Sequence, residues 1–246
     1  LVSVGTYDEV IKLKSDISIK GESRTKTILQ SEATKIINLD NVSNVQIENL
    51  TVDGRTLVHT PIAIKDSDNI RLNNITVKAG AFYNLKADTS EALSINECRF
   101  RYGNEYGVSI DRTGGTVSDS VFRFGNRTLL SVSNSKDEVL TVSNCEFFDD
   151  QEKTWTAIVC EGQLARDKFI GNNIKLSRKG YPVIKIRGSA QPVFRRNKIE
   201  GGRISIKIEA TATPDFGTKS GFGYNHILPG TEFRVVGERE EEDGPI

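Results

Sequence analysis

Residues 92–103 read ALSINECRFRYG and residues 115–125 read GTVSDSVFRFG, and this pair of stretches decides the fold. Each has the same order of apolar and polar positions, and each has a phenylalanine, Phe100 or Phe122, three positions before a glycine. Similar stretches occur along nearly the whole chain of 246 residues, as NVQIENLTVDG, NIRLNNITVKA, VLTVSNCEFF, GQLARDKFIGN and PVFRRNKIEGG. A sequence that repeats with a period of about 20 to 50 residues is typical of solenoids, propellers and other repeat architectures.

Aligning these repeats gives three apolar columns, with steps of 22 to 30 residues. The first column is Ile47, Leu72, Ile95, Val117, Val142, Leu164 and Phe194. The second is Val52, Val77, Phe100, Phe122, Phe147, Phe169 and Ile199. The third is Ile64, Ala87, Ile110, Val132, Cys160, Ile186 and Ile208.

Within each repeat, apolar and polar residues alternate over short spans, which indicates β-strands. Three short strands in some two dozen residues leave no room for a helix, so each repeat is expected to form one coil of a parallel β-helix. We predict an all-β solenoid of about nine coils, with three short strands per coil, as a single domain over residues 1–236. Residues 237–246 are expected to form a charged tail or linker.

The composition excludes several classes of protein. Lysine plus arginine and aspartate plus glutamate are equal at 33 each, which argues against a general nucleic-acid-binding protein. No apolar run approaches the roughly 18 to 20 residues that a membrane span needs. The three cysteines cannot form a disulfide framework. Cys98 and Cys145 fall in one inward column, with Asp167 and Asn197, and are predicted to be buried free thiols two coils apart.

The third strand of each coil should present two outward rows. The first row is Ala63, Lys86, Ser109, Ser131, Val159, Lys185 and Lys207. The second row is Lys65, Asp88, Asp111, Ser133, Glu161, Arg187 and Glu209. Asp88 and Asp111 would be like-charged neighbours, which is unfavourable unless a cation lies between them. Lys65, Lys86 or Arg112 could supply that cation, and so could Ca²⁺, which takes carboxylate oxygens as ligands.

Aromatic and basic residues gather where the chain enters this strand. The aromatic residues are Tyr83, Tyr106, Trp155 and Tyr181, whose rings could stack on sugar faces or cover the edge of the sheet. The basic residues are Lys175, Arg178, Lys179, Lys185, Arg187 and Lys207. Such a cluster suits an anionic polysaccharide. A solvated charged face is the alternative, and the alternating charges of Glu161, Arg187 and Glu209 also fit a simple ladder of ion pairs.

Recurrent Gly-Asn pairs, such as Gly103-Asn104 and Gly125-Asn126, are predicted to be corners in which glycine takes a positive φ.

The N-terminal segment resembles the first coil of a known superfamily. Val4-Gly-Thr-Tyr-Asp-Glu-Val-Ile-Lys-Leu, followed by Ile17-Ser-Ile-Lys-Gly and Thr27-Ile-Leu, is similar to the opening of pectin-lyase-like proteins, which are single-stranded right-handed parallel β-helices. The general resemblance covers nearly the whole chain and extends more distantly to secreted bacterial proteins related to chondroitinase B and alginate lyases. It implies a polysaccharide ligand and a bacterial protein that is secreted or held at the cell surface. The catalytic signatures of pectin methylesterases and of Asp-Pro-His-Asp epimerases are missing from the sequence.

The resemblance also implies a candidate enzymatic activity, the β-elimination of a uronate-containing polysaccharide. Lys185 or Arg187 would then act as the base or neutralise the carboxylate, Tyr181 or Tyr106 would act as the acid, and Asp88 with Asp111 would hold Ca²⁺. The candidate substrate-binding residues are Trp155, Tyr83, Lys86, Glu161, Arg178, Lys179 and Lys207. Two alternatives remain open: a non-catalytic carbohydrate-binding or adhesion module, and a structural stalk. A monomer is expected, with no nucleic-acid partner and no certain cofactor.

Overall fold

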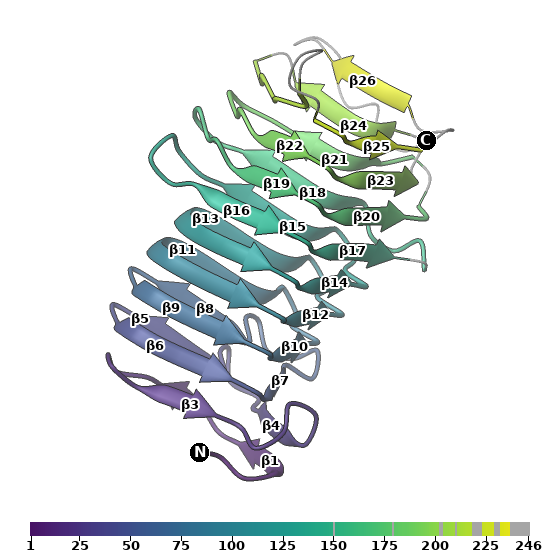
Figure 1. Cartoon of the computed structure of the whole chain (residues 1–246). Coiled ribbons are helices and arrows are strands. Elements are labelled where there is room, and N and C mark those ends of the chain that lie inside the picture. Colours follow the sequence, from purple (N-terminus) through teal and green to yellow (C-terminus); the bar gives the residue numbers. More distant parts are fainter. Residues whose placement is uncertain are drawn as a thin grey trace.

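The computed structural model is one continuous solenoid of parallel strands (Figure 1). It describes residues 1–149, 151–178, 180–201, 204–209, 211–217, 223–228 and 232–236. All regular secondary structure in these residues is strand, and the strands pair in parallel from coil to coil. The predicted all-β, right-handed parallel β-helix is confirmed. The predicted tail at 237–246 lies outside the described residues.

Three stacks of strands, here named faces A, B and C, surround the core. Face A contains β1 (Gly5–Asp8), β4 (Thr27–Gln30), β7 (Thr51–Asp53), β10 (Thr76–Lys78), β12 (Arg99–Arg101), β14 (Val121–Arg123), β17 (Glu146–Asp149), β20 (Asn173–Leu176), β23 (Lys198–Gly201) and β25 (His226–Ile227). Face B contains β2 (Ile11–Lys12), β5 (Ile37–Asp40), β8 (Ile62–Lys65), the first parts of β11 (Tyr83–Asn96) and β13 (Tyr106–Ser118), β15 (Thr128–Ser133), β18 (Thr156–Glu161), β21 (Pro182–Ile186), β24 (Ile204–Glu209) and β26 (Glu232–Val236).

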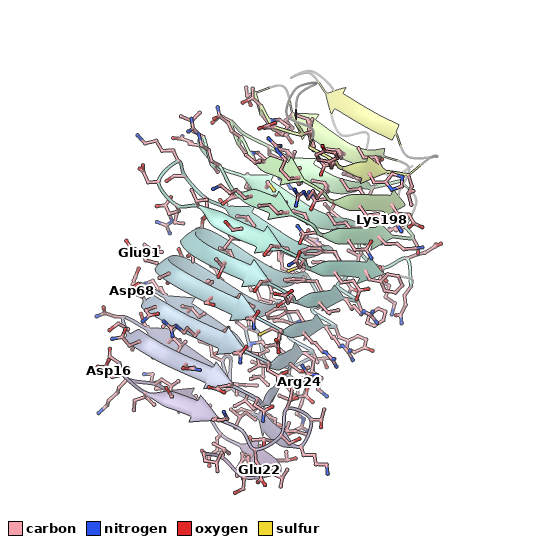
Figure 2. The ribbon with its side chains drawn as sticks, viewed as in Figure 1. Asp16, Glu22, Arg24, Asp68, Glu91 and Lys198 are labelled. Atoms are coloured by element: carbon pink, nitrogen blue, oxygen red, sulfur yellow. The ribbon has the colours of Figure 1, made fainter. Side chains whose placement is uncertain are left out.

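Face C contains β3 (Ser18–Lys20), β6 (Ser43–Glu48), β9 (Asp68–Asn73), the second parts of β11 and β13, β16 (Leu140–Ser143), β19 (Lys168–Ile170) and β22 (Val193–Arg195). These are eight strands among the described residues, so the solenoid has about eight complete coils, close to the predicted nine. β11 pairs with β8 and then with β9, so one strand serves two faces there. Charged side chains project outward from the coils, as Asp68 and Glu91 do on adjacent coils (Figure 2).

The inward columns confirm most of the predicted register. The third column pairs throughout as predicted, from Ile64 and Ala87 to Ile186 and Ile208. The first and second columns are wrong in a single coil. Phe169 stacks in the first column, between Val142 and Phe194, and Ile174 takes its place in the second.

The error arises in the turn before β19. Leu164, predicted to be inward, has a φ of 55° and is 45% exposed, because the chain makes an extra loop there before it rejoins the stack. The repeat in this coil therefore begins five residues later than the alignment assumed. The same shift moves Asp167 out of the predicted column of Cys98 and Cys145, and Asn172 lies there instead.

Two rows of buried polar side chains line the inner corners. At the corner between faces C and A, each asparagine Oδ1 accepts from a backbone N–H of the preceding coil. Asn172 Oδ1 accepts from the Cys145 N–H at 2.9 Å, and Asn197 Oδ1 accepts from the Asn172 N–H at 2.9 Å. At the corner between faces B and C, Asp167 accepts from the Asn134 amide at 2.9 Å and from the Leu140 N–H at 2.9 Å. These bonds satisfy backbone groups that the strands leave unpaired at each bend.

Burial explains the ionisation of these inner groups. Desolvation raises the pKa of Asp167 to about 6, against the lowering effect of its hydrogen bonds. Desolvation likewise raises the pKa of both Cys98 and Cys145 to about 12. Both cysteines are at most 1% exposed and unbridged, so the prediction of buried free thiols is confirmed.

Candidate functional site

The candidate site is built on the turns that join face A to face B, here called the A–B corner. Its successive turns are residues 79–82, 102–105, 124–127 and 151–155, and a fifth, around Tyr181, follows β20. Successive turns stack because the backbone N–H groups of one coil donate to carbonyl oxygens of the preceding coil, as Trp155 N does to Arg127 O at 2.9 Å. Side chains at equivalent positions therefore form rows along the solenoid axis.

The corner turns correct one prediction about glycine. The prediction of a positive φ is confirmed at Gly171 (68°) and Gly201 (100°), which the sequence repeat places at equivalent positions. It is wrong at Gly103 and Gly125, where the preceding residues Tyr102 (57°) and Phe124 (58°) take the positive φ instead. Glycine is needed for space instead, because a Cβ at position 103 would lie 2.6 Å from the carbonyl oxygen of Tyr106. The tight turn thus forces the preceding aromatic residue into the left-handed region and points its ring outward.

Five residues of this corner form a cationic–aromatic ledge: Glu105, Arg127, Trp155, Arg178 and Tyr181. The Trp155 and Tyr181 rings stack with centroids 5.0 Å apart and an interplanar angle of 14°. The Arg178 guanidinium lies 5.7 Å from the Trp155 centroid and 4.9 Å from that of Tyr181. Arg127 lies 5.1 Å from the Trp155 centroid, and its Nε is 2.7 Å from Glu105 Oε2. The ledge combines stacked rings with two guanidinium groups, and Trp155 is 36% exposed.

The other two predicted aromatic residues form a separate pair. Tyr83 and Tyr106 stack at 5.3 Å and 19°, and the Lys86 ammonium lies 5.8 Å from the Tyr83 centroid. Burial, and the charges at Tyr106 and Glu105, raise the pKa of Tyr83 above its ordinary value. The register shows that the coil of Thr128 separates this pair from the coil of Trp155. The four aromatic residues therefore make two stacks and not one row.

The candidate catalytic residues do not converge. Lys185 Nζ lies 4.0 Å from Glu209 Oε1, and Arg187 Nη1 lies 3.8 Å from Glu161 Oε2. Tyr181 precedes Lys185 by four residues, which is about 13 Å along a strand. Tyr106 lies three coils from Tyr181, or about 14 Å at the spacing of strands in a sheet.

The remaining predicted binding residues are Lys207, Glu161 and Lys179. Lys207 is the register neighbour of Lys185 on face B. Glu161 pairs with Arg187, and exposed pairs of this kind contribute about 0 to 1 kcal/mol. Lys179 lies outside the described residues.

Asp88 and Asp111 are register neighbours, as predicted. Arg112 lies between them, with Nη2 2.8 Å from Asp88 Oδ1 and Nε 3.5 Å from Asp111 Oδ2. The chain itself thus supplies a cation, one of the alternatives that the sequence left open. No group of three or more His, Cys, Asp or Glu side chains suited to a metal ion occurs in the described part of the chain, and Ca²⁺ at these two aspartates stays a prediction.

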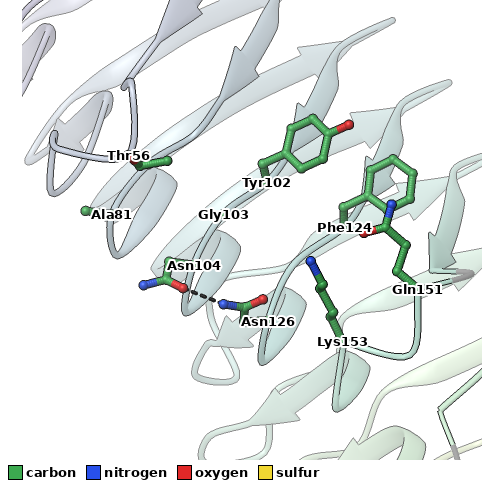
Figure 3. Close-up of a pocket in the computed structure, with 10 residues that line it drawn as sticks. Thr56, Ala81, Tyr102, Gly103, Asn104, Phe124, Asn126, Gln151 and Lys153 are labelled. Atoms are coloured by element: carbon green, nitrogen blue, oxygen red, sulfur yellow. Dashed lines mark hydrogen bonds between the residues drawn. The ribbon is translucent and has the colours of Figure 1, made fainter.

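Sequence reasoning missed a groove on the face A side of the corner. It encloses about 250 Å³, and Tyr102, Phe124, Asn104, Asn126 and Lys153 are among its lining residues (Figure 3). The signal was present in the repeated triplets Tyr-Gly-Asn and Phe-Gly-Asn, which were interpreted only as turn chemistry.

Known proteins show the same architecture. The chain aligns over 97% of its length with Geobacillus virus E2 ORF18 (TM-score 0.51, 14% identity), although it spans only 53% of that protein. It aligns with PfbA, a surface adhesin of Streptococcus pneumoniae (TM-score 0.50, 12% identity, 98% of this chain and 85% of that chain). It also aligns with the endo-xylogalacturonan hydrolase of Aspergillus tubingensis (TM-score 0.50, 10% identity, 95% and 89%). At these identities the likeness shows the fold, a parallel β-helix like the one that the sequence resemblance implied.

Sequence comparison assigns the family. No curated protein matches the chain. Within the described ranges there is no helix of the length and hydrophobicity that a bilayer crossing requires.

A family profile described as "NosD: Periplasmic copper-binding protein (NosD)" matches residues 17–229, which is most of the solenoid. The chain therefore belongs to the NosD family of parallel β-helix proteins.

Proposed function

We propose that this protein binds an acidic polysaccharide at the cationic–aromatic ledge. The observation that carries the proposal is the stack of Trp155 and Tyr181 with Arg178 held against both rings. Aromatic rings present flat apolar area to the apolar face of a sugar. Guanidinium groups bind carboxylates in a planar, bidentate manner, which suits a uronate. A polymer lying along the corner would meet two guanidinium groups, Arg127 beside Trp155 and Arg178 beside both Trp155 and Tyr181.

The relatives support this proposal in general terms. One solved neighbour is named as a polysaccharide hydrolase and another as a surface adhesin. A shared fold is compatible with many functions, so these names support the ligand class and not an activity. We also infer that the protein acts outside the cytoplasm, in keeping with the periplasmic description of its family.

Binding fits the geometry better than β-elimination does. A lyase needs a base and an acid within hydrogen-bond reach of the same sugar. Tyr106 lies three coils, or about 14 Å, from Tyr181, and Lys185 lies about 13 Å from Tyr181 along the strand. Lyase activity at this face remains a prediction that an assay can decide.

Copper does not fit the donor groups of the described residues. Proteins bind copper through cysteine, methionine and histidine side chains, and the sequence has no methionine and two histidines. His59 precedes β8, whereas His226 lies in β25, many coils away. The three cysteines are buried, and desolvation raises the pKa of each thiol, which disfavours the thiolate that binds metal. We therefore derive no copper chemistry for this chain.

The test is calorimetric titration of the protein with oligomers of galacturonate, alginate and chondroitin. We expect one of them to bind, and the Trp155→Ala and Arg178→Ala variants to bind it on the order of tenfold more weakly. Arg71→Ala, which removes an exposed arginine on face C, is the matched control and should bind normally. Absorbance of an unsaturated uronate product, with and without Ca²⁺, would show lyase activity. If none of the three acidic oligomers binds, the proposed function is wrong.

A further inference from the structure

The groove at the A–B corner has an aromatic wall. The Tyr102 and Phe124 rings stack with centroids 5.2 Å apart and an angle of 14°. Tyr102 is 49% exposed, so the stack presents apolar area to solvent. Both residues have a positive φ, which is unfavourable for a bulky side chain. Two successive coils thus hold an aromatic ring outside the core in the same unfavourable backbone conformation.

The opposite wall of the groove is made of amides. Asn104 and Asn126 are exposed, and the Nδ2 group of Asn126 donates to Oδ1 of Asn104 (Figure 3). This bond leaves the Asn104 NH₂ group as a donor and the Asn126 carbonyl oxygen as an acceptor. The two groups lie on adjacent coils, about 4.8 Å apart along the axis. Side-chain amides that can both donate and accept are well suited to sugar hydroxyls.

A hydrogen-bonded turn closes one end of the groove. The Asp149 carboxylate is fully buried and accepts from the N–H groups of Gln151 (2.9 Å), Lys153 (2.9 Å) and Thr154 (2.5 Å). The Thr154 hydroxyl donates to the carbonyl oxygen of Gly125 at 2.6 Å, which ties this turn to the preceding coil. Gln151 and Lys153, whose N–H groups make two of these bonds, lie beside the groove (Figure 3).

We infer that this groove is a second glycan-binding site, and that it takes neutral pyranose units. The residues that line it include one cation, Lys153, and no carboxylate, whereas the ledge carries Arg127, Arg178 and Glu105. Its aromatic and amide walls each span two adjacent coils, so a linear chain along the solenoid axis would meet equivalent groups at two successive steps. The inference rests on the proposed function in that it assigns the same class of ligand, a polysaccharide, to a different surface.

The experiment uses neutral probes against the full chain. Cellohexaose, xylohexaose and mannohexaose are titrated by calorimetry into the wild type, into Tyr102→Ala and Asn104→Ala, and into Trp155→Ala. We expect at least one neutral hexamer to bind. Its affinity should fall on the order of tenfold in the two groove variants and stay unchanged in Trp155→Ala. The control is Tyr224→Ala, which removes another exposed tyrosine with positive φ (49°), and which should bind normally.

The outcomes separate this inference from the proposed function. If no neutral hexamer binds, or if Tyr102→Ala binds as the wild type does, the groove is not a glycan site, whatever the ledge does. If neutral hexamers need the groove while acidic oligomers fail to bind, the groove is a glycan site and the ledge proposal is wrong. Thermal unfolding of each variant shows whether a loss of affinity reflects a loss of fold: a groove variant that melts like the wild type but binds weakly supports the site.

Discussion

Two kinds of aromatic stack, one inside the solenoid and one outside it, have nearly the same geometry. Inside, Phe122 stacks on Phe100 at 5.1 Å and on Phe147 at 4.6 Å. Outside, Tyr102 stacks on Phe124 at 5.2 Å, and the Trp155–Tyr181 pair is 5.0 Å apart. The inner phenylalanines are at most 1% exposed, whereas Tyr102 is 49% exposed. Because coils repeat at the spacing of strands in a sheet, rings repeated in register stack both inside and outside the solenoid, so stacking geometry alone does not distinguish a structural ring from a ligand-binding one.

Burial is what separates the two stacks. An inner ring gains the free energy of leaving water and of close packing, so the fold needs it. An outer ring adds little of either, and at Tyr102 it also carries the cost of a positive φ. The comparison therefore assigns stability to the inner rows and leaves the outer rings free for the ligand binding proposed above, and each of the following experiments tests that division.

The largest effect is expected for Phe122→Ala. The substitution removes the central ring of the inner stack and leaves a cavity that neighbouring coils cannot fill, so the free energy of unfolding should fall by about 3 to 5 kcal/mol. Urea denaturation followed by far-UV circular dichroism measures this change. A loss below about 1 kcal/mol would mean that the inner stack does not stabilise the fold as burial implies.

The next effect is expected for the buried polar row, with Asp167→Asn. Burial raises the folded-state pKa of Asp167 to about 6 from an ordinary 3.8, so the folded protein binds this proton more tightly than the unfolded chain. Stability should accordingly fall as pH rises from about 4 to about 6 and stay lower above that range, by an amount on the order of 3 kcal/mol. Asparagine keeps an oxygen that can accept from Asn134 and Leu140 without carrying a charge.

The measurement for Asp167→Asn is the free energy of unfolding at pH 4 and at pH 8. The variant should be more stable than the wild type at pH 8 and differ little from it at pH 4. An equal difference at both values would show that Asp167 does not titrate within this range in the folded protein.

A smaller effect is expected where the fold and the groove meet, with Gly103→Ala. The new Cβ would lie 2.6 Å from the carbonyl oxygen of Tyr106 and 3.1 Å from the Cα of Gly107, both backbone atoms. The turn must shift to relieve this contact, and overpacking of this kind costs about 1 to 3 kcal/mol. Gly114→Ala is the matched control, because its nearest contact would be an ordinary 3.5 Å. Equal melting temperatures for the two variants would contradict the tight corner.

The sequence was enough to predict the solenoid, its three columns and the outward rows of face B. The recurring apolar columns and the alternation within each repeat carry that information, because inward positions tolerate only residues that fill the same space in every coil. The alignment was wrong where a longer turn delayed the strand, so that Phe169 and Leu164 were placed in the wrong columns. Apolar pattern alone cannot tell an extra loop residue from an inward one.

The surface was harder to predict for a different reason. Tyr83 and Trp155 both lie at the A–B corner as expected. Whether their rings belong to one continuous stack depends on which residue occupies the same position on the coil between them. Arg127 lies in that gap and was not among the predicted residues, although it links Glu105 to Trp155. The groove was not predicted because each Gly-Asn pair was interpreted as a turn. The φ values show that the aromatic residue before the glycine, Tyr102 or Phe124, is the one in the left-handed conformation.

The smallest effect on stability is expected for Tyr102→Gly, which tests most directly whether the outer rings contribute to the fold. Glycine adopts a φ of 57° without steric cost, so the change relieves backbone strain while it removes one exposed stacking contact. These two contributions are each about 1 kcal/mol and oppose one another, so the melting temperature should change by only a few degrees in either direction. The same variant should lose the binding of neutral hexasaccharides. If Tyr102→Gly were as destabilising as Phe122→Ala, the outer stack would be part of the core, and the division between inner and outer rows would fail.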